Sequence, residues 1–140
     1  EGFLKEKLIA KSKKLNIDKN VKFAGHVDHK QVLEVLANAS ACVMSSIWPE
    51  PLSRTALESL SVTTPLVISK RSGNAEFFKN KRWGYTVSPT TDDLTNGIIK
   101  ALKNKKKLKE NLISDRQFIN RLLSQKIYDS YQRIYRQLLK

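Results

Sequence analysis

Two short apolar runs on either side of one expected helix constrain this chain more than any other feature. The runs cover residues 41–46 and 65–69, and each has the length and composition of a buried strand. Residues 52–62, between them, are expected to form the helix. A strand, a helix and a second strand predict one turn of a parallel α/β fold, in which ligands bind where strand carboxyl ends meet helix amino ends.

Two carboxylates, Glu50 and Glu58, stand eight positions apart around the start of this expected helix. On a fully helical path they would lie roughly 12 Å apart, at about 1.5 Å per residue. That separation exceeds the roughly 5–9.5 Å between the two carboxyls of a glycosidase. It suits two hydrogen-bond acceptors that hold opposite ends of an extended polar ligand. Each carboxylate is also four positions from Arg54, so surface ion pairs are the alternative explanation.

The first part of the chain predicts three further elements. We expect an amphipathic helix over residues 3–15 and a short strand over residues 21–25, which ends at a glycine. Asp28 is expected to cap the next helix, with Gln31 three positions later completing a capping-box pattern.

The second part of the chain predicts a last strand and a helical tail. We expect a strand over residues 85–87, a helix that begins at Asp92, and helices from about Lys105 onward, where apolar residues recur at helical spacing. Together the elements predict an α/β fold: a Rossmann-like parallel sheet of about four strands, with helices on both faces and a helical C-terminal tail. Because a helix precedes the first strand, we expect residues 1–140 to form a single domain whose first strand or strands lie upstream.

Composition indicates a globular and strongly basic chain. Of its 140 residues 40% are hydrophobic, and the formal net charge is +13. No apolar run approaches the roughly 20 residues that span a bilayer, and lysines interrupt the first 20 residues, so no signal peptide is expected. The single cysteine, Cys42, lies within an expected strand and is interpreted as a core residue, which favours the reducing cytoplasm.

The positive charge is concentrated at the end of the chain. Residues 100–140 carry twelve Lys or Arg against three acids, and so supply +9 of the net charge. Such an excess can attract nucleic acid, anionic lipid or an anionic substrate, or it can simply solvate helix faces. His26 and His29 lack the neighbours of a metal site, so no metal and no cofactor are expected.

Short motifs occur in a fixed order along the chain. They are Val21-Lys22-Phe23-Ala24-Gly25, Ser45-Ser46, Glu50-Pro51-Leu52-Ser53, Leu57-Glu58, Pro65-Leu66-Val67-Ile68-Ser69, Ser72-Gly73-x-x-Glu76 and Gly84-x-x-Val87-x-Pro89. This set resembles the C-terminal, donor-binding domain of glycosyltransferase family 4 (group 1), whose members are retaining glycosyltransferases of the GT-B fold. The resemblance runs from about residue 13 to residue 102, and the tail is similar to that family's closing helices.

The resemblance implies a role for the helix at residues 52–62 and its preceding loop. Glu58 would accept hydrogen bonds from the ribose hydroxyls, and Glu50, at the catalytic position, would contact hydroxyls of the transferred sugar. The remaining donor-binding residues implied on this helix offer backbone amides to the diphosphate: Leu52, Ser53 and Arg54.

Other positions implied by the resemblance lie in loops. The loop that follows the nucleotide base would contain Gly25, His26 and Val27. Two further residues are candidates with open alternatives: Trp48 lines a sugar pocket or covers the core edge, and Glu76 contacts the ligand or a helix start.

The resemblance implies transfer of a hexose from a nucleotide sugar (UDP-, GDP- or ADP-linked) to a glycan or a lipid-linked acceptor, in surface polysaccharide or lipopolysaccharide assembly. No protein nucleophile is needed, so catalysis is mainly electrostatic positioning. The expected location is cytoplasmic, with a peripheral contact to anionic membrane and no nucleic-acid partner. The chain has Ser53 where the family usually has glycine, and it lacks the upstream strand that carries an Arg and a Lys, so we expect the isolated chain to be inactive.

Three alternatives remain at this point. A GT-B sugar-nucleotide 2-epimerase shares the architecture, but the Glu50 and Glu58 spacing fits it less well. A basic nucleic-acid-binding module predicts salt-sensitive binding and leaves both glutamates unexplained. A remnant without activity is the third.

Overall fold

The computed structural model of the chain describes residues 2–78, 82–122 and 125–138. Contacts divide the chain into two compact units, Glu1–Val32 and Leu33–Lys140.

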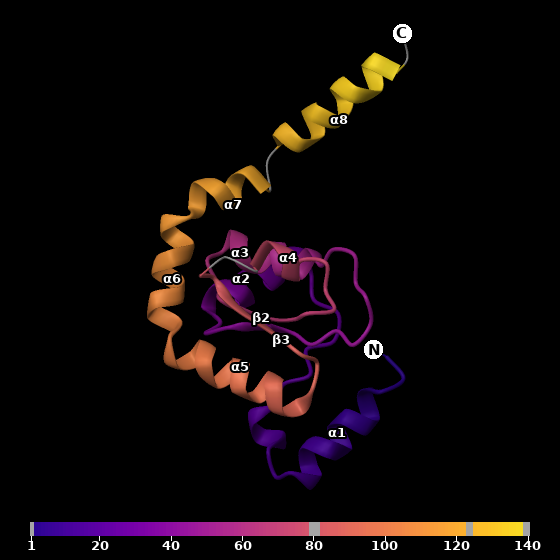
Figure 1. Ribbon diagram of the computed structural model, residues 1–140. Helices are drawn as coiled ribbons and strands as arrows, with labels where there is room; N and C mark the ends of the chain where they lie inside the picture. Colours follow the sequence, from indigo (N-terminus) through magenta and orange to yellow (C-terminus); the bar gives the residue numbers. More distant parts are fainter. Residues whose placement is uncertain (1, 79–81, 123–124, 139–140) are drawn as a thin grey trace. The chain divides into compact units, whose positions relative to one another are not determined.

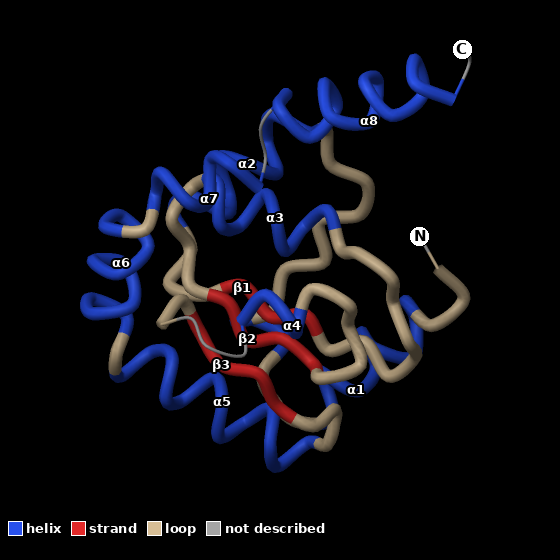
Figure 2. The backbone as a smooth tube through the Cα atoms, turned by 45° about the horizontal axis from the view of Figure 1, so that its top comes forward, coloured by secondary structure: helices blue, strands red, loops and turns tan. Residues whose placement is uncertain are grey.

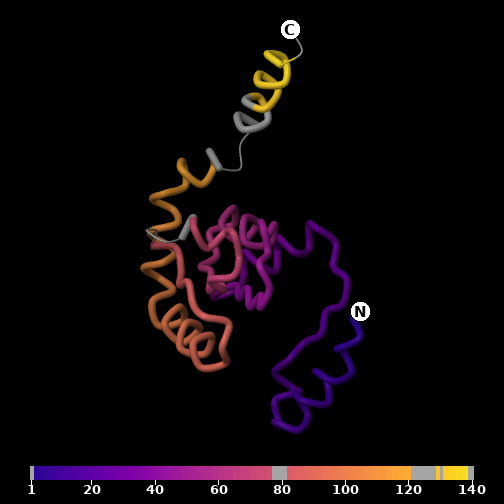
Figure 3. The backbone as a smooth tube through the Cα atoms, turned by 45° about the vertical axis from the view of Figure 1, so that its right-hand side comes forward, coloured from indigo at the N-terminus to yellow at the C-terminus, as the bar shows by residue number. Residues whose placement is uncertain are grey.

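The first unit contains a helix, a short 3₁₀ turn and an extended segment (Figure 3). Helix α1 spans Lys5–Lys14, and Asn16 follows it at φ 55°, in the left-handed region where asparagine is tolerated. The 3₁₀ turn η1 spans Asp18–Asn20. The predicted Asp28 cap is confirmed, because the Asp28 side chain accepts a hydrogen bond of 3.1 Å from the Gln31 amide.

The strand predicted over residues 21–25 is wrong. Val21 is extended and Gly25 has φ 69°, but none of these residues is part of a strand, and the sheet contains none of them. An extended segment becomes a strand only when its backbone amides and carbonyls pair with a neighbour, which sequence composition does not decide. The composition of residues 21–25 therefore did not reveal that this segment lacks a neighbouring strand.

The second unit holds a three-stranded parallel sheet in the order β1-β2-β3, which Figure 2 shows in red. The strands are β1 (Cys42–Met44), β2 (Leu66–Ser69) and β3 (Gly84–Val87). Val43 pairs with Val67, and Val67 pairs with Tyr85. The predicted fold class is confirmed, with three strands among the described residues because residues 21–25 do not pair.

Helices lie before, between and after the strands, as labelled in Figure 1. They are α2 (His29–Asn38), α3 (Arg54–Ser61), α4 (Ala75–Phe78), α5 (Thr91–Lys103), α6 (Lys105–Ser114), α7 (Arg116–Leu122) and α8 (Gln125–Leu138). Thr90 caps α5 through its side chain, which accepts from the Asp93 amide. The predicted helical C-terminal tail is confirmed.

Central strand β2 separates two apolar layers. All four of its residues are buried, and alternate side chains along a strand point to opposite faces. On one face Leu66 and Ile68 pack with residues of α3, α6 and α7, and on the other Val67 packs with residues of α5 and α6. The helices therefore cover both faces of the sheet, as a parallel sheet requires.

A buried tryptophan ties the tail to the core. The Trp83 side chain is 0% exposed, and its Nε1–H donates a hydrogen bond of 2.7 Å to Asp115 Oδ2. Its ring lies 5.8 Å from the ring of Phe118, centre to centre. The side chain of Asn111 donates to the Arg82 carbonyl at 2.9 Å. These contacts fix α6 and α7 against the sheet.

Candidate functional site

The loops that follow β1 and β2 meet at the carboxyl end of the sheet. Glu50 and Ser72 form an isolated parallel bridge beyond the strands themselves. The Glu50 amide donates to the Arg71 carbonyl at 3.3 Å, and the Gly73 amide donates to the Glu50 carbonyl at 2.6 Å. In parallel α/β sheets, this end is where ligands bind.

Gly73 permits this approach because it has no side chain. A Cβ atom at Gly73 would lie 1.9 Å from the carbonyl oxygen of Pro51. No Cβ atom fits at that distance, so any other residue would push the two loops apart.

Asn74 holds the start of α3 from the other loop. Its side chain is 0% exposed; Oδ1 accepts from the Ser53 amide, and Nδ2 donates to the Ser53 carbonyl at 3.4 Å. The Ser72 hydroxyl also donates to Asn74 Oδ1, at 3.3 Å. The backbone just before α3 is therefore fixed by a side chain from the loop after β2.

Helix α3 begins at Arg54 rather than at residue 52, with Ser53 as its N-cap. The Ser53 hydroxyl accepts from the Ala56 amide at 3.4 Å, and the Ser53 amide already donates to Asn74. Neither of these two hydrogen bonds uses the amides of Arg54 and Thr55, which belong to the first turn of α3. Since first-turn amides point along the helix axis, these two are the donors best placed for an anion.

Glu50 lies before the helix, so the fully helical path that gave the 12 Å separation from Glu58 does not apply. Its side chain is half-buried, and Oε2 accepts a hydrogen bond of 2.8 Å from the Ser46 hydroxyl. The nearby Trp48 is 59% exposed and Leu52 is 53% exposed. The carboxylate is thus oriented by Ser46 within a loop that carries exposed apolar side chains.

Glu58 lies one turn into α3 and is largely shielded from solvent. Its side chain is 17% exposed, against 84% for Arg54, and the two form an ion pair with Arg54 Nη2 3.8 Å from Glu58 Oε1. The ion pair that sequence spacing offered as an alternative is therefore present at Glu58. Because one partner is exposed and the distance is long, such a pair contributes about 0–1 kcal/mol.

The other predicted positions are placed as follows. Glu76 is exposed in the first turn of the four-residue α4. Gly25, His26 and Val27 belong to the first unit: Gly25 has φ 69° and lines a shallow hollow with Phe23, His26 is exposed, and Val27 is half-buried. The structure therefore brings Glu50, Ser53, Arg54 and Glu58 together on one loop and helix.

Sequence reasoning missed two residues that build this site. Ser46 was noted only as part of a motif, and Asn74 occupies an unspecified position of the motif Ser72-Gly73-x-x-Glu76. The bond from Asn74 to Ser53 spans 21 positions, so nothing local in the sequence indicates it. An uncharged, buried asparagine in a turn-rich segment is the one signal that could have suggested a structural hydrogen bond.

The predicted core position of Cys42 is confirmed in part, because its side chain is half-buried at the edge of the core. It packs against the core cluster that includes Ala56 and Leu60 of α3. Burial raises the pKa of the Cys42 thiol, and a hydrogen bond with Ser59 acts in the opposite direction with a smaller effect.

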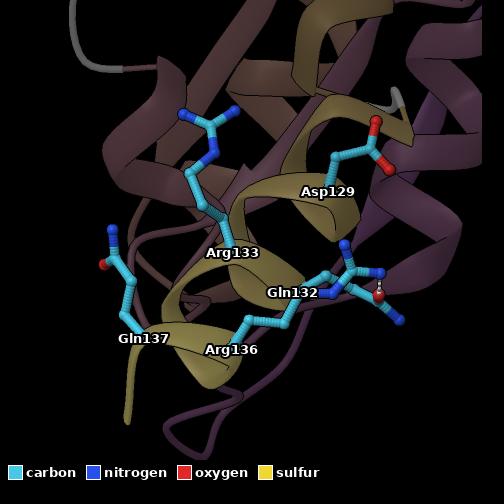
Figure 4. A pocket seen from close by; sticks show the side chains of 5 residues that line it. All are labelled: Asp129, Gln132, Arg133, Arg136 and Gln137. Carbon is cyan, nitrogen blue, oxygen red and sulfur yellow. Dashed lines mark hydrogen bonds between the residues drawn. The ribbon is translucent and has the colours of Figure 1, made fainter. Parts of the chain in front are cut away.

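Helix α8 carries a second hollow, shown in Figure 4. It is lined by polar side chains of this one helix: Asp129, Gln132, Arg133, Arg136 and Gln137. The Arg136 Nη2 donates to Gln132 Oε1 at 3.2 Å. A hollow formed by one helix surface encloses no ligand, so it is not a second candidate site.

The described residues contain no group of three or more His, Cys, Asp or Glu side chains that could hold a metal ion. None of the helices in this described part is long and apolar enough to cross a membrane.

Comparison with known proteins gives concordant matches. Residues 1–117 match the family model described as "Glycosyl transferases group 1". Glycogen synthase of Mycobacterium tuberculosis (strain H37Rv) is 35% identical over 89 residues, which are 64% of this chain and 21% of that protein. Spore coat protein SA of Bacillus subtilis (strain 168) is 31% identical over 68 residues, which are 49% of this chain and 18% of that protein.

A solved structure has the same fold. Sucrose-phosphate synthase of Thermosynechococcus elongatus superposes with a TM-score of 0.85 at 24% sequence identity, over 96% of this chain and 34% of that one. The chain thus spans about a fifth of the length of the curated relatives that it matches.

Proposed function

Because the chain belongs to the group 1 glycosyl transferases, of the GT-B type, we propose that it is the C-terminal, donor-binding domain of a retaining family 4 glycosyltransferase. The observation that carries this proposal is the junction of the loops after β1 and β2. Through the Glu50–Ser72 bridge and the Asn74–Ser53 hydrogen bonds, that junction fixes a carboxylate and a helix start at the carboxyl end of a parallel sheet.

The diphosphate of the donor binds at the first turn of α3. The amides of Arg54 and Thr55 carry the positive end of the helix dipole, and anions are stabilised there by about 0.3–1 kcal/mol or more. The Arg54 guanidinium is 84% exposed and adds a positive charge at the same turn. Leu52 and Ser53 border the site of the diphosphate, and the Ser53 amide donates its hydrogen bond to Asn74.

The ribose binds beside Glu58. Glu58 stands four positions after Arg54, which is about 6 Å along the helix axis and matches the step from a phosphate to the sugar of a nucleotide. A carboxylate accepts strong hydrogen bonds from two neighbouring hydroxyls. Because Glu58 is only 17% exposed, it accepts these bonds in a partly desolvated setting where they are stronger.

The transferred hexose binds beside Glu50. Ser46 holds one carboxylate oxygen, which leaves the other to accept from sugar hydroxyls. Trp48 offers an exposed aromatic face for the same sugar, and Glu76, in the first turn of α4, is a further contact. By the family resemblance, Gly25, His26 and Val27 contact the nucleotide base.

Transfer needs the leaving diphosphate to be stabilised while an acceptor attacks the same face of the sugar, so this domain acts by positioning and electrostatics. The acceptor is a glycan or a lipid-linked sugar held by a separate domain, in surface polysaccharide or lipopolysaccharide assembly. The setting is cytoplasmic, with a peripheral contact to anionic membrane. The 140-residue chain by itself binds donor without completing transfer.

A ligand-observed NMR screen of UDP-, GDP- and ADP-sugars tests this proposal. We expect one nucleotide class to bind, and binding to be lost in Glu58→Ala. Glu110→Ala removes an exposed carboxylate on α6, away from the site, and is the matched control. Absence of binding by every nucleotide sugar, or equal binding in wild type and Glu58→Ala, overturns the assignment.

A further inference from the structure

The junction of α5 and α6 presents a dense group of lysines. Five exposed lysines lie within eight positions, and we call them the lysine corner: Lys100, Lys103, Lys105, Lys106 and Lys107. The sequence contains no acid between Asp93 and Glu110 to offset them. The corner is the orange turn between α5 and α6 in Figure 3.

The lysine corner has a fixed position in the fold. On its inner side, Ala101 is 0% exposed and Leu108 is 6% exposed, and both pack in the cluster around Val67. The Asn104 side chain, at the junction itself, donates to the Tyr85 hydroxyl at 3.1 Å and to the Lys100 carbonyl at 3.0 Å. The five charges therefore lie on an ordered surface of the second unit.

Two aliphatic side chains are exposed beside these charges. Ile99 is 44% exposed and Leu102 is 47% exposed. They stand three positions apart on α5, so they share one face of the helix. A surface that combines lysines with exposed aliphatic groups favours a partner that offers both negative charge and an apolar layer.

We infer that the lysine corner is a peripheral docking surface for a membrane that contains anionic phospholipid. Clusters of four to eight basic residues bind anionic headgroups, and adjacent aliphatic side chains enter the boundary between headgroups and acyl chains. This inference rests on charge and exposure at α5 and α6, and it stands whether or not the α3 site binds a nucleotide sugar.

The residue types at the corner argue against nucleic acid as the partner. The sequence has no arginine between Arg82 and Arg116, and arginine is the residue that grips a phosphate with two hydrogen bonds. It also has no aromatic residue between Tyr85 and Phe118, and Tyr85, which contacts Asn104 at the junction, is half-buried, so the corner offers bases little aromatic surface.

Vesicle sedimentation with matched charge variants tests the inference. The corner variant replaces Lys100, Lys103, Lys105, Lys106 and Lys107 by Gln. The control variant replaces five exposed lysines of the first unit by Gln: Lys7, Lys11, Lys13, Lys14 and Lys19. Both variants lose the same charge, so only its location differs.

We expect wild type to bind vesicles of phosphatidylcholine mixed with phosphatidylglycerol, and not vesicles of phosphatidylcholine alone. The corner variant is expected to lose roughly 100-fold or more in affinity, because each lysine at an anionic surface contributes about fivefold. The control variant is expected to stay within about fivefold of wild type, the contribution of one such lysine. Equal losses in the two variants, or no binding by wild type, overturn the inference.

A second variant separates lipid from polyanion binding. Ile99→Ala with Leu102→Ala keeps every charge, and alanine suits the helix. We expect it to weaken binding to the mixed vesicles while its weak binding to duplex DNA stays unchanged. Tighter binding of wild type to duplex DNA than to the vesicles, at equal salt, assigns the corner to nucleic acid and rejects the membrane inference.

Discussion

The side chain of Asn74 makes two hydrogen bonds to the backbone of Ser53, one as acceptor from its amide and one as donor to its carbonyl. The two residues are 21 positions apart, in loops that follow different strands. The pair makes the position of the α3 start depend on the loop after β2. In the proposed function, that loop therefore positions the donor diphosphate without touching it.

Replacing Asn74 by Ala is expected to destabilise the fold by about 1–3 kcal/mol. It leaves the buried Ser53 amide without its partner, and it removes one of two hydrogen bonds to the Ser53 carbonyl, which also accepts from the Leu57 amide at 3.4 Å. Urea unfolding measures this change. Asn96→Ala, at an exposed position on α5, is the control and is expected to be within about 0.5 kcal/mol of wild type. Equal stabilities of the two variants would show that the hydrogen bonds contribute nothing.

Gly73→Ala tests the contact between the two loops. The new Cβ would lie 1.9 Å from the Pro51 carbonyl oxygen, so the Glu50 loop must shift. We expect a loss of about 1–3 kcal/mol in stability and a weaker affinity for the nucleotide sugar. Gly2→Ala is the control, because a Cβ there has nothing within 4 Å. Donor affinity and stability that match those of Gly2→Ala would contradict the close packing.

Thr63→Gly is expected to stabilise the protein. Thr63 follows the C-cap residue of α3 and has φ 60°, a left-handed conformation that a β-branched residue adopts at a cost of about 1–2 kcal/mol. Glycine removes most of that cost but is more flexible when unfolded, so the net gain is about 1 kcal/mol. Thermal and urea unfolding should rank the variants Gly above Asn above wild-type Thr. A glycine variant less stable than wild type would show that the Thr63 side chain makes contacts worth more than the strain.

Cys42, the single cysteine, reports on the sheet beneath the site. Burial raises the pKa of its thiol above the ordinary 9.0, so it stays protonated and should react slowly with a thiol reagent at neutral pH. Because the folded pKa is the higher one, this thiol favours the fold below its ordinary pKa, and stability declines as the pH rises above it. Cys42→Ala should remove that part of the decline. Labelling as fast in native protein as in urea would contradict the burial.

The sequence predicted the sheet where local composition decides the structure, and it failed where a distant partner decides it. The run at residues 65–69 is apolar on both faces, so it could only be a buried strand, and β2 confirms this. Residues 21–25 have strand composition but no paired neighbour. The helix predicted over residues 52–62 begins two residues later, at Arg54, and the bonds from Ser53 to Asn74 depend on tertiary structure.

In the C-terminal tail, too, the sequence predicted the local structure but not the tertiary contacts. Helical spacing indicated that residues after Lys105 are helical, and α6, α7 and α8 confirm it. Nothing in that spacing indicated that the buried Trp83 would bond to Asp115 and fix the first part of the tail to the core. Pairing of that kind becomes visible only once the chain is folded.

The most direct test of the donor-site assignment compares a nucleoside diphosphate with its 2′,3′-dideoxy form, in wild type and in Glu58→Ala, by calorimetric titration. If Glu58 accepts the ribose hydroxyls, wild type should bind the dideoxy ligand about 10- to 100-fold more weakly, and Glu58→Ala should bind both ligands equally weakly. The same penalty for the dideoxy ligand in both proteins would contradict the account, and would remove the ribose role from Glu58.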